Sequence, residues 1–433
     1  MKKVLIFSIL LVAGLAGSQI APGLLGDAFP AFSEIVTFFT MTGLAFIMIH
    51  VGYEFEIDKS NLRSYGWDYV VAMTAAAFPW IFVTGYFLFV MLPPETWSSF
   101  DAWKETLLAG RFAAPTSAGV LFSMLAAAGL SATWLFKKAR ILAIFDDLDT
   151  VLLMIPLKMM IVGLAWQLGL IVVLMAVMLW AAWKWLHKLN IPSSWGYVLT
   201  YSLVIAGISE ILYVVSKVMD DTVPMHIEVL LPAFVLGCMI KYPEGQNPHV
   251  DDAREGHQEG PESEIEQKVS TIVSGIFMVL VGLTMPAVFG DVSKAVGEVA
   301  ATVTASQPFP GWDWIAFHVL MITIISNLGK MFPAFVYRKE AHWRERLAVA
   351  IGMWPRGEVG AGVLVLSISY GIGGPIVTVA MISLALNLLL TGVFIWFVKR
   401  LLRGVPEHDE RRPQDPPEAP RAEAPLPAES LVE

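Results

Sequence analysis

The sequence contains few of the residues that build disulfide-bonded, soluble or nucleotide-binding domains. It has a single cysteine, Cys238, which excludes an intrachain disulfide. Charged residues make up only 15% of the 433 residues, against 56% that are hydrophobic, and the mean hydropathy is +0.63. Nucleotide-binding loops, zinc-ligand spacings and catalytic triads do not rise above background. We therefore expect no enzyme, no cofactor and no nucleic-acid partner, and the composition excludes an ordinary soluble domain.

Long apolar runs repeat from one end of the chain to the other. Each has about 20 residues, the length of a helix that crosses a bilayer, whereas a transmembrane β-barrel would show shorter alternating strands. We predict about twelve spans, near residues 4–24, 33–54, 67–92, 105–127, 139–163, 165–186, 195–216, 224–241, 269–290, 313–336, 346–371 and 375–401. The predicted fold class is an all-α polytopic membrane protein in contact with the lipid bilayer.

Two polar segments stand apart from the spans. Residues 242–267 are rich in acidic side chains, and residues 404–433 are rich in both proline and acidic side chains. Neither has the apolar periodicity that builds a core, so we expect disordered cytoplasmic segments within and after a transmembrane domain of residues 1–403. The first apolar run fits either a cleaved signal peptide or a retained helix, and its continuation to Leu25 favours the helix.

Basic residues gather in alternate loops. One set of loops contains Lys2, Lys3, Lys59, Arg63, Lys137, Lys138, Arg140, Lys184, Lys188, Arg338, Lys339, Arg344, Arg346, Lys399, Arg400 and Arg403. The opposite set has little beyond Lys104, Lys217 and Lys294. By the positive-inside rule, both termini are expected to be cytoplasmic in a cell membrane, which agrees with an even number of spans.

The fourth and eleventh spans are interrupted near the middle. Pro115 is followed by Thr116 and Ser117 in the fourth span, and Pro355 and Arg356 lie between glycines in the eleventh. Proline removes a backbone donor, so we expect both spans to unwind at membrane depth. Broken helices at corresponding positions of oppositely oriented halves are the pattern of an inverted-repeat transporter with a central binding site. Two ordinary proline kinks are the alternative interpretation.

Charged residues at membrane depth mark the candidate site. An ionised carboxylate in the hydrocarbon region costs at least about 2.5–3.5 kcal/mol, yet Asp146 and Asp147 lie in an apolar span. Asp146 lies about 9 Å beyond Arg140, and Lys330 lies about 12 Å before Arg338, both measured from the cytoplasmic side. We therefore expect Asp146 to pair with Lys330, while Asp147, about 100° further round the helix, faces a cavity.

Asp147 is accordingly the predicted cation- and proton-binding carboxylate. One carboxylate that binds either a proton or a hard monovalent cation couples the two without a second energy source. Thr116 and Ser117, with carbonyl groups freed in the fourth span, are expected to complete the shell of a bound Na⁺. The alternative is a structural Asp–Lys network in a membrane receptor or scaffold.

Four segments resemble one family. Residues 114–121 (Ala-Pro-Thr-Ser-Ala-Gly-Val-Leu) and 144–148 (Ile-Phe-Asp-Asp-Leu) resemble the crossover and ion-binding segments of the monovalent cation:proton antiporter superfamily, particularly its sodium/proton exchangers. Residues 328–330 (Leu-Gly-Lys) and 353–360 (Met-Trp-Pro-Arg-Gly-Glu-Val-Gly) are similar to its tenth-span lysine and second broken helix. With weaker matches elsewhere, the resemblance covers most of residues 35–400.

The resemblance implies a core domain of crossed broken helices that moves against a dimerisation panel, and hence a homodimer. It implies these roles: Asp147 as the cation and proton carboxylate, Asp146 as the partner of Lys330, Thr116 and Ser117 as the crossing segment, and Arg356 with Glu358 as a supporting polar pair. Two residues depart from the family pattern. Asp149 adds a third carboxylate, and Lys158 lies about 16 Å beyond Asp147 on the same face, where it either pairs with an acid such as Asp149 or Glu210 or alters the ion path.

The predicted function is therefore secondary antiport of a monovalent cation, Na⁺ or Li⁺, against protons by alternating access. Participation of Lys330 with both aspartates predicts two protons for one sodium and electrogenic transport. Potassium/proton antiport and organic-anion symport on a related inverted-repeat fold are the transport alternatives.

Overall fold

The computed structural model describes residues 2–53, 62–131, 133–162, 166–219, 229–241, 264–285 and 302–403. Within these ranges the regular structure is helical, apart from one isolated bridge between Leu189 and Ile240. The tail 404–433 and most of the polar segment 242–267 lie outside the described residues. Residues 264–267 are an exception, because they already belong to a helix.

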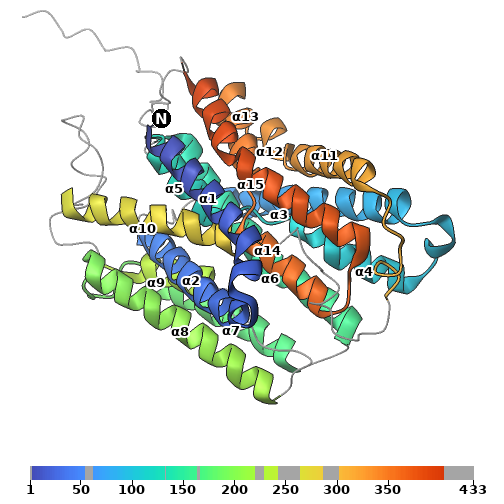
Figure 1. Ribbon diagram of the computed structural model, residues 1–433. Coiled ribbons are helices and arrows are strands. Elements are labelled where there is room, and N and C mark those ends of the chain that lie inside the picture. Colours follow the sequence, from blue (N-terminus) through green and yellow to red (C-terminus); the bar gives the residue numbers. More distant parts are fainter. Residues whose placement is uncertain are drawn as a thin grey trace, which may run out of the picture.

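The helices follow the predicted spans closely (Figure 1). Their bounds are α1 Lys2–Leu25, α2 Phe29–Tyr53, α3 Leu62–Tyr86, α4 Phe100–Gly110, α5 Ala118–Ala127, α6 Trp134–Val162, α7 Trp166–Lys184, α8 Trp195–Met219, α9 Leu230–Met239, α10 Glu264–Leu283, α11 Trp312–Gly329, α12 Phe332–Phe335, α13 Trp343–Gly352, α14 Glu358–Ser369 and α15 Gly374–Leu402. Five described helical stretches are long and apolar enough to cross a membrane: Lys2–Tyr53, Ser64–Met91, Trp195–Val218, Trp312–Phe335 and Gly374–Leu402. Taken with their breaks, the described helices correspond to parts of all twelve predicted spans, and residues 54, 163, 165, 224–228 and 286–290 of those spans lie outside the described residues.

The helices form two groups. In the first, which we call the panel, α1 packs along α10, and α2 packs along α9 and α8. The panel helices approach until their backbones touch: a Cβ added to Gly52 would lie 2.2 Å from the carbonyl oxygen of Phe234, and one added to Gly282 would lie 2.4 Å from that of Leu11. Glycine is therefore required at these contacts.

The second group, which we call the core, contains α3–α6 and α11–α15. Within it α3 contacts α6 and α11, while α15 contacts α11 and α13. Each half of the core has the same order: a helix, a broken helix and a second helix. Corresponding members are the third and tenth, the fourth and eleventh, and the fifth and twelfth spans, each seven positions apart. Because seven is odd, the two halves have opposite orientations across the membrane.

The fourth and eleventh spans are broken, and the two breaks cross. After α4, a short 3-10 turn at Arg111–Ala113 leads into extended backbone before α5. The chain between α13 and α14 is likewise non-helical. The amide of Ser117 donates to the carbonyl of Pro355 at 3.0 Å, and Thr116 Oγ1 donates to the carbonyl of Met353 at 3.1 Å. Backbone groups freed by one break thus satisfy groups freed by the other.

A third break was not predicted from the sequence. The span expected at 313–336 divides into α11 and the single-turn α12, and Lys330 lies at the division. Pro333 is in the first turn of α12, where its missing amide is tolerated. A Cβ on Gly329 would lie 2.7 Å from the backbone nitrogen of Pro79, so α11 and α3 are in backbone contact directly beside this break.

Candidate functional site

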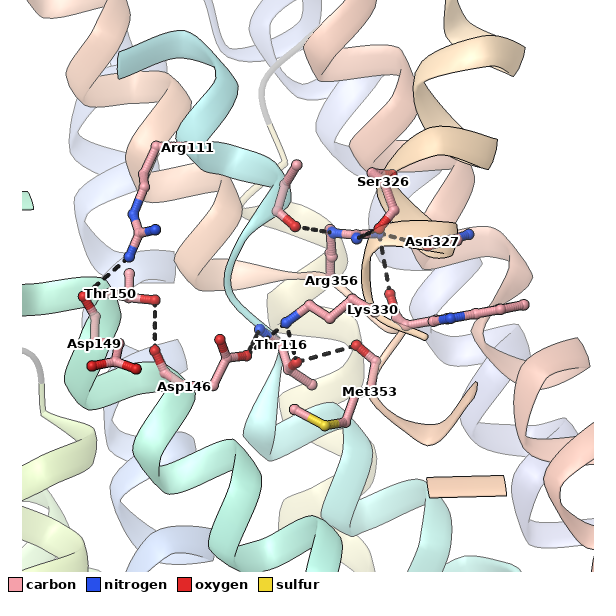
Figure 2. A network of polar contacts seen from close by, with 12 residues as sticks. Arg111, Thr116, Asp146, Asp149, Thr150, Ser326, Asn327, Lys330, Met353 and Arg356 are labelled. Carbon is pink, nitrogen blue, oxygen red and sulfur yellow. Dashed lines mark hydrogen bonds and ion pairs between the residues drawn. The ribbon is translucent and has the colours of Figure 1, made fainter. Parts of the chain in front are cut away.

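The centre of the core contains the predicted ion pair. Lys330 Nζ lies 2.7 Å from Asp146 Oδ2, and both side chains are 0% exposed. Lys330 comes from the break after α11, and Asp146 comes from the middle of α6, so two elements far apart in the sequence converge (Figure 2). A buried pair of this kind has a large desolvation cost, which only close geometry and additional hydrogen bonds offset.

Thr116 supplies those additional bonds. Its amide donates to Asp146 Oδ2 at 2.8 Å, and its hydroxyl accepts from Lys330 Nζ at 2.8 Å while donating to Met353. Thr116 is therefore the point where the aspartate, the lysine and both broken helices meet (Figure 2). Through Thr116, both charged side chains are thus connected to the crossing.

Ser117 has a local role in this state. Its side chain caps α5 by accepting from the amide of Val120 at 3.4 Å. Asp147 is 7% exposed on α6, next to Asp146. The predicted participation of Thr116 and Ser117 in a cation shell stays a prediction, because the bonds of both residues described above hold the crossing together.

Arg356 occupies the second break and is fully buried. Its guanidinium donates to four groups: the Ala113 carbonyl at 2.9 Å, Asn327 Oδ1 at 2.7 Å, the Ser326 carbonyl at 2.9 Å and, at 3.4 Å, the carbonyl of Trp354. It thus ties the first break and the end of α11 to the second break. The Glu358 side chain lies outside what the structure describes, so the predicted Arg356–Glu358 pair stays a prediction.

Asn327 and Ser326 were not among the predicted site residues. Asn327 lies three residues before Lys330, one helical turn away, and its side-chain oxygen holds Arg356. A polar residue one turn from a buried lysine was the available signal. Sequence reasoning missed it because the break at Lys330 was not predicted.

The third carboxylate, Asp149, has partners that sequence reasoning did not find. Asp149 Oδ1 accepts from the hydroxyl of Tyr69 at 2.8 Å, and its backbone carbonyl accepts from Arg111 Nη2 at 3.1 Å. Arg111 is the first residue of the first break, and its charge at membrane depth was the sequence signal that could have identified it.

Lys158, further along α6, is partly buried, and its role stays a prediction. Among the described side chains, no group of three acidic, histidine or cysteine residues is placed to hold a metal ion.

A separate ionic cluster lies near the N-terminal ends of α3 and α6. Lys138 Nζ lies 3.1 Å from Asp68 and 3.0 Å from Glu340, and the hydroxyl of Tyr337 donates to Asp68 at 2.7 Å. Burial, followed by the charge of Asp68, raises the pKa of Tyr337 above its ordinary value, so this hydroxyl remains a donor at physiological pH. The cluster joins α3, α6 and the loop before α13.

Crossed broken helices around a buried lysine–aspartate pair are the arrangement of a membrane transporter. A family model for "sodium/hydrogen exchanger, transmembrane" matches residues 2–400. The chain belongs to this family, whose members exchange cations for protons. The structure of the sodium proton antiporter MjNhaP1 from Methanocaldococcus jannaschii at pH 8 is similar, with a TM-score of 0.52 and 15% sequence identity. The match covers 89% of this chain and 91% of that one, and at this identity it supports the fold alone. No curated protein sequence matches the chain.

Proposed function

We propose that this protein exchanges Na⁺ for protons by alternating access, with Asp147 as the carboxylate that binds either ion. The observation that carries the proposal is the fully buried Asp146–Lys330 pair at the helix crossing, with Asp147 adjacent on α6. Membership of the family supports exchange of cations for protons. The buried pair beside Asp147 supports the assignment of that exchange to these residues. Li⁺ is the expected alternative substrate because it is also a hard monovalent cation.

The charges of the site support coupling of two protons to one cation. A cation bound by Asp147 replaces the proton of that carboxylate and adds a positive charge near Lys330. In a low-dielectric core the added charge favours loss of a proton from a neighbouring cationic side chain. Lys330 is the side chain that loses it, because arginine side chains do not deprotonate in proteins. Each cycle then moves two protons against one Na⁺, and transport is electrogenic.

The packing of the panel helices supports the proposal that the panel is the fixed element of the mechanism. Its glycine-mediated backbone contacts make it rigid, while the core contains all three breaks. We propose that the core moves against the panel, that two copies associate through their panels as a homodimer, and that both termini are cytoplasmic in a cell membrane.

Proteoliposomes with an internal pH dye test the proposal. Addition of Na⁺ or Li⁺ should change the dye signal, and an imposed inside-negative potassium-diffusion potential should bias the Na⁺ response. No response to Na⁺, Li⁺ or K⁺ would overturn cation:proton exchange. A response to K⁺ alone would instead support potassium/proton antiport, and a response that ignores the potential would indicate one-for-one coupling.

A further inference from the structure

The C-terminal end of α15 contains three basic side chains around one small pocket, which we call the α15 pocket. Its lining consists of Trp396, Lys399, Arg400 and Arg403. The Arg400 guanidinium lies over the Trp396 ring, 5.6 Å from its centroid, and Lys399 donates to the carbonyl of Ala128 at the end of α5. Within the described part of the chain, none of the three cations is within ion-pair distance of a carboxylate. The positive charge of the α15 pocket is therefore not compensated by these residues.

An exposed apolar stripe runs along α15 towards this pocket. Leu389, Val393 and Trp396 are 41%, 45% and 42% exposed. Arg400 and Arg403, also exposed, continue the same spacing of alternately four and three residues. Residues at this spacing share one face of an α-helix. This face of α15 is therefore apolar along its length and cationic at its end.

The length of α15 places the cations at the level of lipid headgroups. The helix has 29 residues and is therefore about 43 Å long, whereas the hydrocarbon core of a bilayer is about 30 Å thick. The last turn of a spanning helix of this length extends beyond the hydrocarbon. The apolar stripe then lies against acyl chains, and the α15 pocket lies where the phosphates begin.

The neighbouring helix α1 adds positive charge at the same end. The two helices touch where a Cβ on Gly392 would lie 2.2 Å from Ser8 Oγ. They belong to the first and twelfth spans and so run in opposite directions, which places Lys2 and Lys3, at the start of α1, at the end where α15 finishes (Figure 1). The surroundings of the α15 pocket therefore strengthen its attraction for an anion.

We propose that the α15 pocket binds the phosphate of an anionic phospholipid whose acyl chain lies along the apolar stripe. The planar guanidinium groups of Arg400 and Arg403 match the oxygens of a phosphate, and the exposed side chains before them match a hydrocarbon chain. A soluble phosphate shares the headgroup chemistry but makes no use of the stripe. The proposal is independent of which ions the protein exchanges.

The end of α7 offers a matched control within the same chain. Val173, Val177 and Trp180 form an exposed stripe with the same spacing, followed by Lys184, whose Nζ lies over the Trp180 ring at 4.6 Å. Lys188 follows and donates to the Lys184 carbonyl. Residues 166–190 contain no arginine, so this end presents lysine charges without a guanidinium group. It measures the general attraction of a basic helix end for anionic lipid.

The first test counts lipids bound to the full-length protein in detergent. Phosphatidylglycerol and phosphatidylcholine with identical acyl chains are added separately, and mass spectrometry of the intact complexes gives the affinity for each. The unmodified protein should prefer phosphatidylglycerol. The double variant Arg400→Gln, Arg403→Gln should bind it about 30-fold more weakly, the equivalent of about 1 kcal/mol for each basic residue at the membrane surface. Both arginines are exposed, so the variant should keep the unfolding temperature that the unmodified protein has without lipid.

The control double variant Lys184→Gln, Lys188→Gln should keep most of the preference for phosphatidylglycerol. Equal losses in the two double variants would show only general surface attraction and would overturn the proposal. So would an unmodified protein without any preference, including one whose pocket is occupied by the acidic residues that follow Arg403. The variant Arg400→Lys, Arg403→Lys keeps the charge and should bind more weakly than the unmodified protein, because lysine lacks the bidentate geometry.

The second test distinguishes a lipid from a soluble anion. The unfolding temperature is measured with phosphatidylglycerol and with inorganic phosphate at the same concentration. Phosphatidylglycerol should raise it in the unmodified protein and in the α7 control variant, but much less in the Arg400→Gln, Arg403→Gln protein. Inorganic phosphate should leave all three unchanged. An equal increase with inorganic phosphate that requires Arg400 and Arg403 would assign the pocket to a soluble anion and overturn the lipid proposal.

Discussion

The panel and the core differ in what holds their helices together. Panel helices meet through glycine, with backbone against backbone at Gly52 and Gly282. Core helices also meet at a glycine, where Gly329 lies against Pro79, but the core differs from the panel in its ionised side chains, above all Asp146 and Lys330, and in three interruptions of helical hydrogen bonding. Backbone contacts are insensitive to protons and cations, whereas ion pairs respond to both. The difference supports the proposal that the panel serves as the scaffold and the core carries the ion.

The largest expected effect concerns transport through the core. Asp147→Asn should abolish cation-coupled proton movement while the protein still folds and inserts, because an amide does not exchange a proton. Dye-loaded proteoliposomes measure the transport, and a thermal-shift assay checks the fold. Near-normal exchange by a folded Asp147→Asn protein would remove Asp147 from its assigned role.

The next effect concerns stability of the core. Asp146→Asn leaves Lys330 buried without its carboxylate, and breaking a buried pair in this way costs about 3–5 kcal/mol. We expect a clearly larger loss of thermal stability than for Asp147→Asn. The reverse order of the two variants would mean that Asp146 is not the structural partner of Lys330.

A panel substitution should separate stability from ion chemistry. A Cβ at Gly52 would lie 2.2 Å from the Phe234 carbonyl oxygen, so Gly52→Ala should destabilise the protein by about 1–3 kcal/mol through overpacking. Gly207 on α8 has no atom within 4 Å of an added Cβ, and Gly207→Ala is the matched control. Unfolding temperature and apparent Na⁺ affinity are both measured. A change in Na⁺ affinity in folded Gly52→Ala would show that the panel contributes to the ion site.

The smallest expected effect concerns the ionic cluster near the N-terminal ends of α3 and α6. Tyr337→Phe removes one hydrogen bond to Asp68, which keeps Lys138, so the loss should be about 1 kcal/mol. The pKa of Tyr337 is raised in the folded state, so its contribution is complete below the ordinary tyrosine pKa of about 10 and declines as pH rises above it. Chemical denaturation should therefore give the same difference between unmodified and Tyr337→Phe protein from about pH 6 to 9. A difference that disappears within this range would contradict the arrangement.

The comparison between core and panel also shows what could be predicted from the sequence. Hydropathy predicted the spans, because a bilayer requires apolar helices of nearly fixed length. Pro115 and Pro355 predicted two breaks, and the depths of Asp146 and Lys330 predicted their contact, because helical rise converts residue number into distance.

The remaining features depend on tertiary contacts. Lys330 lies at a break produced by Gly329 against Pro79 and by Pro333, and neither residue alone indicates where α11 ends. Arg111 contacts Asp149 only because the first break turns its side chain towards α6. Such partners are set by how the core halves cross, which one sequence does not encode as a local pattern.

The most direct test of the central claim counts protons released when the cation binds. Na⁺ is added to detergent-solubilised protein in weakly buffered solution, and the change in pH is converted to protons per Na⁺ bound. The account predicts about two protons, from Asp147 and Lys330, and none for Asp147→Asn. Sodium binding without proton release, or equal release by Asp147→Asn, would contradict it.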